Sequence, residues 1–288
     1  MMLLSRVARA TLAAAFGALL ALPAVAAQPG AAFPEVPTPY LPSTTVAVEE
    51  ILRLADVKPG DLVVDLGSGD GRIPIAAARY FGARGYGVDI DGKLVAEANE
   101  NARQAGVADR VRFEQKDVFQ TDISNASVVT LYLLSGLVNR LQPKLLKEMK
   151  PGARIIAHDY PFEGWTADRT VNISKTYYLY VVPAQAGGRW RLATQLPEGE
   201  RIFDLDIKQD RQKVSGGARV QGGFLPLFDA QLAGDRLRFV LVDEQRALHF
   251  EGRVNGSLLE GSVRMGIGNA EVTRPWRATR VLGAGDEG

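Results

Sequence analysis

The chain of 288 residues contains no cysteine and only two histidines, His158 and His249. The absence of cysteine excludes disulfide frameworks, cysteine-ligated zinc, iron–sulfur clusters and thiol nucleophiles. Two histidines also argue against a histidine-rich metal site, so we expect no resident metal. Lysine and arginine together number 34 against 33 aspartates and glutamates, a formal net charge of +1. Surfaces that follow nucleic-acid phosphates usually show a basic excess, so we expect no nucleic-acid partner.

Apolar residues, by contrast, are in ordinary supply, at 46% of the chain against 23% charged residues. This composition excludes wholesale disorder and allows a real core. Because domains run to roughly 100–200 residues, the length allows one large domain or two modest ones.

The first 27 residues are typical of a signal peptide. Arg6 and Arg9 give a positive start, and an uncharged, alanine-rich run over 10–27 follows. Ala24-Val25-Ala26 has the small-x-small pattern that a signal peptidase needs. The short apolar run favours a cleaved signal over the alternative, an uncleaved membrane anchor. We expect a periplasmic or secreted protein without stable membrane insertion after cleavage.

Residues 28–43 are a proline-rich linker, and strands then alternate with helices from residue 44. The pattern predicts helices over 46–55, 73–81, 93–105 and 137–149, strands over 62–66, 85–90, 111–115, 128–133 and 153–158, and a closing strand pair over 170–176 and 177–183. Such alternation predicts an α/β fold with a parallel sheet covered on both faces. We assign residues 44–184 to this Rossmann-like domain.

From residue 187 the pattern changes to short alternating runs separated by glycines. It predicts strands over 190–196, 202–209, 213–220, 228–232, 237–242, 248–254, 258–265 and 276–281. Evenly spaced short strands predict a smaller antiparallel all-β domain, a barrel or sandwich, over 187–283. Within it we expect His249 to be a barrel residue and not a ligand, and Trp190 and Trp276 to be core anchors.

The motif that carries chemistry is Asp65-Leu66-Gly67-Ser68-Gly69-Asp70-Gly71, which follows a predicted strand and opens a predicted helix. Its glycines allow a tight turn, and the amides at a helix N-terminus favour a carboxylate or phosphate. Asp89 ends the next predicted strand, 22 residues after Gly67, where a carboxylate can accept both ribose hydroxyls. Turn, context and acid together predict a nucleoside-binding site.

The spacing of the glycines bears on which nucleoside is bound. Dinucleotide binders use G-x-G-x-x-G, whereas the glycines here stand at 67, 69 and 71 behind Asp65. A carboxylate in that place suits a ligand with an ammonium group and repels a pyrophosphate. The motif therefore favours S-adenosylmethionine (SAM) over NAD, and disfavours a nicotinamide oxidoreductase.

Two motifs carry a family resemblance. The run over 40–183, with its glycine motif, resembles a seven-stranded class I methyltransferase. The segment over 64–73 more narrowly resembles the family of mitochondrial lysine methyltransferases that modify the ATP synthase c-subunit and the adenine nucleotide carrier. Pro161-Phe162-Glu163-Gly164-Trp165 resembles that family's Pro-Phe-x-x-Trp after the fifth strand. The export signal and the C-terminal β domain depart from the mitochondrial members.

The resemblance implies SAM as cofactor and methylation of a protein lysine or another amine, on a protein or small-molecule acceptor. It implies a cofactor site in which Asp65, Gly67 and Gly69 hold the methionine end, Asp89 the ribose, and Asp117 with Val118 the adenine, with Ser68 and Gly71 completing the set. A helix cap is the alternative reading of Asp117.

We expect the acceptor at the carboxyl ends of the fourth and fifth strands, where open α/β sheets bind ligands. An attacking amine must be neutral, so an acceptor group or desolvation must lower its pKa. The candidate catalytic residues are His158, Asp159 and Tyr160, with Asp159 as the group that orients the amine. The candidate substrate-binding residues are Tyr132, Phe162 and Trp165, the last two forming an aromatic wall with Tyr160. The alternative is an ordinary strand end with aromatic packing.

Two functions from different classes follow. The first is an exported SAM-dependent methyltransferase. The second is an exported, non-catalytic ligand-binding protein that retains a nucleoside-binding fold. The second gains weight because SAM is made in the cytoplasm, and nothing in the sequence says how it reaches an exported enzyme.

Overall fold

The computed structural model describes residues 43–173, 175–244, 246–266 and 268–281. The predicted signal peptide over 1–27, and all of the predicted linker except Ser43, lie outside the described residues. Within the described ranges, none of the helices combines the length and the apolar character that a membrane crossing requires.

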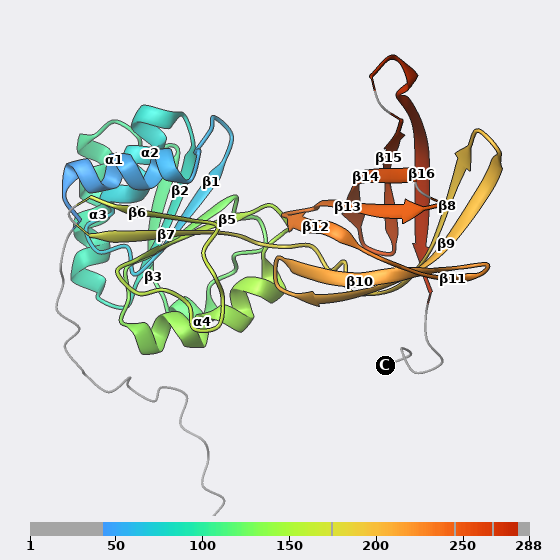
Figure 1. Cartoon of the computed structure of the whole chain (residues 1–288). Coiled ribbons are helices and arrows are strands. Elements are labelled where there is room, and N and C mark those ends of the chain that lie inside the picture. The colour runs from blue at the N-terminus through green and yellow to red at the C-terminus, as the bar shows by residue number, and fades with distance from the viewer. Residues whose placement is uncertain (1–42, 174, 245, 267, 282–288) are drawn as a thin grey trace, which may run out of the picture. The chain divides into compact units, whose positions relative to one another are not determined.

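Seven strands form a mixed sheet in the order β3-β2-β1-β4-β5-β7-β6 (Figure 1). Their bounds are β1 Leu62–Leu66, β2 Arg84–Asp89, β3 Val111–Gln115, β4 Val128–Leu131, β5 Arg154–His158, β6 Arg169–Asn172 and β7 Thr176–Val181. The first five are parallel, and β7 runs antiparallel to both β5 and β6. The strand order reverses between β1 and β4, so their carboxyl ends border the crevice in which such sheets bind ligands.

Helices cover both faces of this sheet, which confirms the predicted α/β fold. The bounds are α1 Thr45–Leu54, α2 Arg72–Phe81, α3 Gly92–Gln104 and α4 Ser135–Glu148. The first three lie on one face and α4 on the other (Figure 1). Because neighbouring strand residues point to opposite faces, Val63 packs with α1 and α2 while Val64 packs with α4.

Two connections are shorter than an α/β crossover usually is. Only a 3₁₀ turn, η1 (Val118–Gln120), lies between β3 and β4, and the residues over 159–168 that join β5 to β6 contain no helix. The carboxyl edge of the sheet is therefore covered by loops at β3 and at β5. Loops of this kind commonly carry functional residues on a rigid scaffold.

Nine further strands form a second, entirely antiparallel sheet (Figure 1). Their bounds are β8 Gly188–Leu196, β9 Gly199–Asp210, β10 Lys213–Val220, β11 Gly223–Pro226, β12 Phe228–Ala233, β13 Arg236–Asp243, β14 Arg246–Asn255, β15 Leu258–Met265 and β16 Val272–Arg280. The last strand, β16, pairs with the first, β8, and the two edge strands, β11 and β12, follow each other in the chain. The sheet is thus a nearly closed up-and-down barrel.

The barrel agrees with its predicted pattern except at one edge. Each predicted run lies within or overlaps a strand, and β11 was missed because its Gly222-Gly223 start reads as a turn. Trp190 and Trp276 are buried, as expected, and His249 lies exposed on β14.

The connection between the two sheets is hydrogen-bonded to β9. Gln209 Oε1 accepts from the amides of Ala186 and Gly187, at 2.7 and 2.8 Å, and its Nε2 donates to Ala184 O at 2.8 Å. By their residue contacts, the two sheets belong to one compact unit. The domain boundaries that the sequence predicted at residues 184 and 187 therefore stay a prediction.

Candidate active site

The turn after β1 requires glycine at two positions. Gly67 has a φ of +87° and Gly71 a φ of +81°, a left-handed region that other residues rarely adopt. A Cβ on Gly67 would lie 2.7 Å from the Leu133 side chain, and one on Gly71 would lie 2.5 Å from the Phe113 ring. The turn is therefore tightly packed between the end of β4 and the strand β3.

Most of the turn's amides are used within the protein. Gly67 N and Ser68 N both donate to Val88 O, at 2.9 Å each. Gly69 N donates to Asp89 Oδ2 at 2.9 Å. These three amides bond the turn to β2, and the predicted roles of Gly67, Ser68 and Gly69 in binding SAM stay a prediction. A phosphate cradle needs its N–H groups free, so this turn does not suit a pyrophosphate.

Negative charge gathers around the turn. Asp65 is buried, with 4% of its surface exposed, and its Oδ1 accepts from Thr130 Oγ1 at 2.6 Å. Burial, with the nearby carboxylates of Asp89 and Asp70, raises the pKa of Asp65 to about 7 against the effect of the Thr130 bond. A buried carboxylate of this kind is stabilised in its ionised form by a cation. The site therefore fits the ammonium at the methionine end of SAM.

The predicted ribose and adenine residues lie next along the carboxyl edge. Asp89 accepts from Gly69 N and, through Oδ1, from Asp91 N at 3.0 Å. Each carboxylate oxygen has a second lone pair, which leaves Asp89 able to accept from two ribose hydroxyls. Asp117 caps η1, and its Oδ1 accepts from Phe119 N at 2.9 Å. The cap is therefore present, and the adenine role of Asp117 and Val118 stays a prediction.

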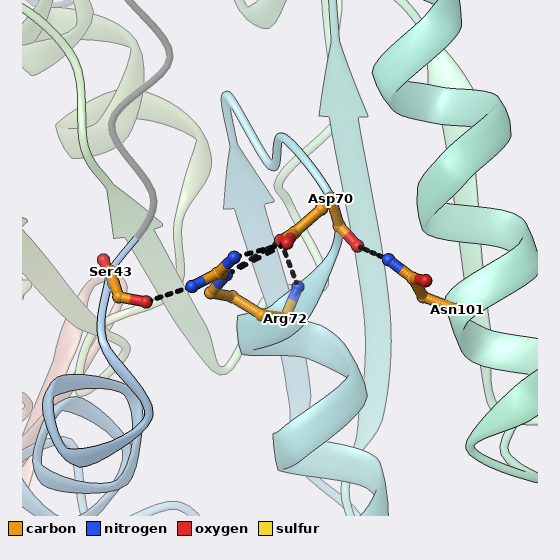
Figure 2. A network of polar contacts seen from close by, with 4 residues as sticks. All are labelled: Ser43, Asp70, Arg72 and Asn101. Carbon is orange, nitrogen blue, oxygen red and sulfur yellow. Dashed lines mark hydrogen bonds and ion pairs between the residues drawn. The ribbon is translucent and has the colours of Figure 1, made fainter.

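A polar network fixes the turn from two sides (Figure 2). Asp70 and Arg72 form an ion pair at 2.5 Å, and the Arg72 guanidinium also donates to Ser43 O. Asn101, on α3, donates to Asp70 O at 3.0 Å. Segments on either side of the motif are thus joined to it, which holds the turn ready for a ligand at low ordering cost.

Three rings meet at the carboxyl ends of β4 and β5. Tyr132 stacks on His158 with ring centroids 3.7 Å apart, and Tyr177 lies 4.5 Å from His158 on a tilted plane. Ser43 Oγ lies 3.4 Å from His158 Nδ1, and His158 Nε2 has no hydrogen-bond partner among the described residues. Burial lowers the pKa of His158 to about 4, so the imidazole is neutral at pH 7. His158 supports Tyr132 through stacking.

Asp159 follows directly, in a left-handed conformation with φ +64°. Its Oδ2 accepts from Lys175 Nζ at 2.8 Å, and its Oδ1 accepts from Thr176 N at 3.2 Å. Burial opposes the charge of Asp159, but the bonds from Lys175 and Thr176 outweigh it and lower the pKa. The end of β5 therefore presents an ionised carboxylate with a lysine ammonium bound to it.

The predicted aromatic wall is exposed only at Tyr160, of which 37% is accessible. Phe162 and Trp165 are each 3% exposed and pack on Tyr180, with ring centroids 4.9 Å away. Phe162 N donates to the Tyr180 hydroxyl at 3.0 Å, and Trp165 Nε1 donates to Gln212 Oε1 at 2.8 Å. The two rings lie in the core rather than on an open wall, and they anchor the loop that presents Asp159 and Tyr160.

Sequence reasoning missed four residues that complete the site. Thr130 could have been found, because it is the polar residue in an otherwise apolar strand. Arg72, opposite in charge to Asp70, stood beside the motif. Ser43 and Lys175 gave no local signal, because their partners are distant in the sequence. Ser43 contacts Arg72, and Lys175 contacts Asp159 on the far side of β6 in the chain.

A sheet ordered β3-β2-β1-β4-β5-β7-β6, with an acidic glycine turn at its carboxyl edge, defines a class I SAM-dependent methyltransferase. The comparisons with known proteins narrow this class. The model of the ANTKMT methyltransferase domain matches residues 65–169. A protein-lysine N-methyltransferase of Saccharolobus islandicus (strain REY15A) is 39% identical over 150 residues, which is 50% of this chain and 93% of that protein. The chain belongs to the methyltransferase family that the ANTKMT domain and this relative represent.

Two further comparisons agree. The ATP synthase c-subunit lysine N-methyltransferase of Mus musculus is 37% identical over 174 residues, 59% of this chain and 69% of that protein. The crystal structure of an RNA methyltransferase from Salinibacter ruber in complex with S-adenosyl-L-homocysteine is 47% identical, with a TM-score of 0.50, and covers 50% of this chain and 95% of that one. The homologues, and the S-adenosyl-L-homocysteine bound in that structure, identify SAM as the cofactor.

Proposed function

We propose that the protein transfers a methyl group from SAM to the ε-amine of a protein lysine. The observation that carries this proposal is the carboxylate of Asp159, which binds a lysine ammonium at 2.8 Å at the end of β5. The same edge of the sheet carries the acidic turn that fits SAM. The two relatives named as lysine N-methyltransferases support a lysine acceptor.

The chain's own groups suit each requirement of that reaction. Bound SAM supplies a sulfonium methyl that an amine can attack in line. Asp65 and Asp89 would hold the methionine and ribose ends on one side of the edge. Asp159 would orient the acceptor nitrogen, with the Tyr132 ring beside it, and aromatic faces attract cations. Alignment of the two reacting groups is worth up to about 7–11 kcal/mol in favourable cases.

The acceptor amine must lose a proton before it attacks, and the partial exposure of the Asp159 side chain allows water to take that proton. The lowered pKa of Asp159 makes it a weak base, so it acts by orientation, and the proton passes to water. The side chain of Asp159 is 21% exposed, which gives water a path to the acceptor nitrogen. The transfer would form a nitrogen–carbon bond and break the methyl carbon–sulfur bond of SAM, whose electron pair stays on sulfur, so that the products would be S-adenosyl-L-homocysteine and a methylated lysine.

The replacement Asp159→Asn tests this role. We expect turnover on lysine-containing proteins to fall by about a hundredfold or more, because the charge that orients the acceptor amine is lost, while the Kd for SAM stays the same. Asp122→Asn is the matched control, since Asp122 is exposed on the connection into β4 at the opposite edge of the sheet. Equal turnover in the two variants would remove Asp159 from the mechanism.

The acceptor class is tested with the same protein. Tritiated SAM is supplied with a set of envelope proteins, with small primary amines, and with RNA, the acceptor named for the Salinibacter ruber protein. We expect label on protein lysines, because the site binds an ammonium and the net charge of +1 offers no phosphate-tracking surface. SAM binding without transfer to any acceptor would favour the non-catalytic ligand-binding alternative.

We further propose that the protein acts in the periplasm or outside the cell. The support is the predicted signal peptide, with its positive start and its Ala24-Val25-Ala26 cleavage pattern. A fusion of residues 1–28 to a reporter that is active only after export should give signal. A silent reporter would contradict the proposal and would also remove the question of how SAM reaches an exported enzyme.

A further inference from the structure

We propose that Lys175 occupies the acceptor-lysine subsite in the free protein, and that an acceptor lysine must displace it to react. The inference rests on the proposed function in one respect, the assignment of Asp159 as the residue that binds the acceptor amine. It adds a specificity-determining residue to that site.

Lys175 Nζ lies 2.8 Å from Asp159 Oδ2, at the carboxyl end of β5. Tyr132, at the end of β4, stacks on His158 next to Asp159, and its phenol also acts on this ammonium, since the Asp159 bond and then Tyr132 raise the pKa of Lys175. The charged nitrogen thus lies between the ends of the two strands at which an open α/β sheet receives its ligand. A lysine side chain already fills the place that the proposed reaction requires for one.

The carboxylate is the fixed partner of the pair and the lysine is the movable one. The Asp159 backbone N–H donates to Thr176 O at 2.8 Å, and its side chain accepts from Thr176 N. Only 21% of the Asp159 side chain is exposed, against 49% for Lys175. Lys175 lies in the turn between β6 and β7, and four rotatable bonds join its nitrogen to that turn. The ammonium can leave while Asp159 keeps its position.

The fold has little need of this ion pair. Pairs with an exposed partner contribute little to stability, because water screens them and two side chains must be ordered. Without Lys175, Asp159 still accepts the hydrogen bond from Thr176 N, and water can replace the lysine as the second hydrogen-bond donor. The replacement of Lys175 should therefore open the subsite and leave the fold intact, which makes the inference testable.

The test titrates a blocked lysine, Nα-acetyl-lysine methylamide, into the protein saturated with S-adenosylhomocysteine. We expect Lys175→Met to bind this probe about fivefold more tightly than the wild type, since one exposed ion pair no longer competes. Lys175→Arg keeps the charge and should bind as the wild type does. The double variant Lys175→Met/Asp159→Asn should lose the gain.

Lys58→Met is the matched control. Lys58 Nζ also lies 2.8 Å from a carboxylate, that of Asp56, but in the connection from α1 to β1 at the amino edge of the sheet. Its probe affinity should equal that of the wild type. An equal Tm for all single variants would show that changes in affinity do not reflect unfolding.

The outcomes separate this inference from the proposed function. Equal or weaker binding of the probe by Lys175→Met overturns the inference, whatever the turnover. Tighter binding by Lys175→Met without methylation of any acceptor by any variant supports the subsite assignment and contradicts the proposed function. Tighter binding together with a lower KM for a lysine acceptor and an unchanged KM for SAM supports both.

Discussion

The carboxyl edge of the seven-stranded sheet and the nine-stranded barrel differ in whether their buried polar groups have hydrogen-bond partners. At the edge, Ser68 Oγ and His158 Nε2 are buried with no partner among the described residues, and burial raises the pKa of Asp65 to about 7. In the barrel, the buried Asp243 is bonded to Arg201 at 3.1 Å, and no described barrel residue has a buried side-chain nitrogen or oxygen without a hydrogen-bond partner.

This difference distinguishes the edge of the sheet, which has the features of a functional site, from the barrel, which has those of a structural domain. Unpaired buried polar groups are costly, so they persist in native structures where a ligand or a reaction uses them. The barrel interior is instead filled by apolar side chains, including a cluster of rings in which Phe250 stacks on Phe239 at 4.8 Å and meets Phe203 and Trp276 edge to face. The barrel is thus a packed body, and the chemistry belongs to the edge of the first sheet.

The largest effect that this difference between the two regions predicts is a loss of stability when a buried ring of the barrel is removed. Phe250→Ala should lower the free energy of unfolding by about 3–5 kcal/mol, because a ring in a dense core leaves a cavity. Phe228→Ala is the control, since that ring is 48% exposed. Chemical denaturation measures both. If the Kd for SAM at 10 °C also changed in Phe250→Ala, the barrel would be part of the site and the comparison would fail.

The next effect concerns the charge at the edge. Asp65→Asn keeps the shape but removes the carboxylate that faces the predicted ammonium, so the Kd for SAM should rise by about a hundredfold. Calorimetric titration of the variant measures this change. Asp243→Asn, a buried acid of the barrel, should leave the Kd for SAM unchanged while lowering stability. The reverse pattern would contradict the separation of the two regions.

The smallest effect is a pH dependence that belongs to Asp65. Its pKa is raised to about 7 in the free protein, so SAM, which favours the ionised form, should bind about tenfold more tightly per pH unit as the pH rises from 5.5 to 6.5. The free energy of unfolding of the free protein should fall as the pH rises from about 4 to 7, because over this range the folded state keeps a proton on Asp65 that the unfolded chain has already released. Both slopes should vanish in Asp65→Asn, and a flat profile in the wild type would show that Asp65 is already ionised.

Local patterns accounted for most of the fold. The strands β1, β3, β10 and β15 have the bounds that the sequence predicted, because buried parallel strands are continuous apolar runs and antiparallel ones alternate. Thr44 caps α1, with its side chain accepting from Ala47 N at 3.3 Å. Each of these features depends on residues within a few positions of one another.

The site could be predicted only in part. The sequence predicted Asp65, Asp89 and Asp159 as the acids of the site, and the structure places all three at or near the carboxyl ends of buried strands, while their roles stay a prediction. It did not show that Phe162 and Trp165 turn into the core. A Pro-Phe-x-x-Trp motif reads the same whether its rings face a ligand or pack on Tyr180, and only the packing of the loop decides between them.

The sequence by itself determined the fold class, the cofactor class and the edge of the sheet that carries the chemistry, because apolar periodicity and glycine spacing are local. Only the tertiary structure decided that Thr130 bonds Asp65, that Arg72 bonds Ser43, and that Lys175 reaches Asp159. These contacts depend on strand register and on turns that bring distant segments together. Neither has a signature within one stretch of chain, since the free energy that selects them comes from packing of the whole sheet.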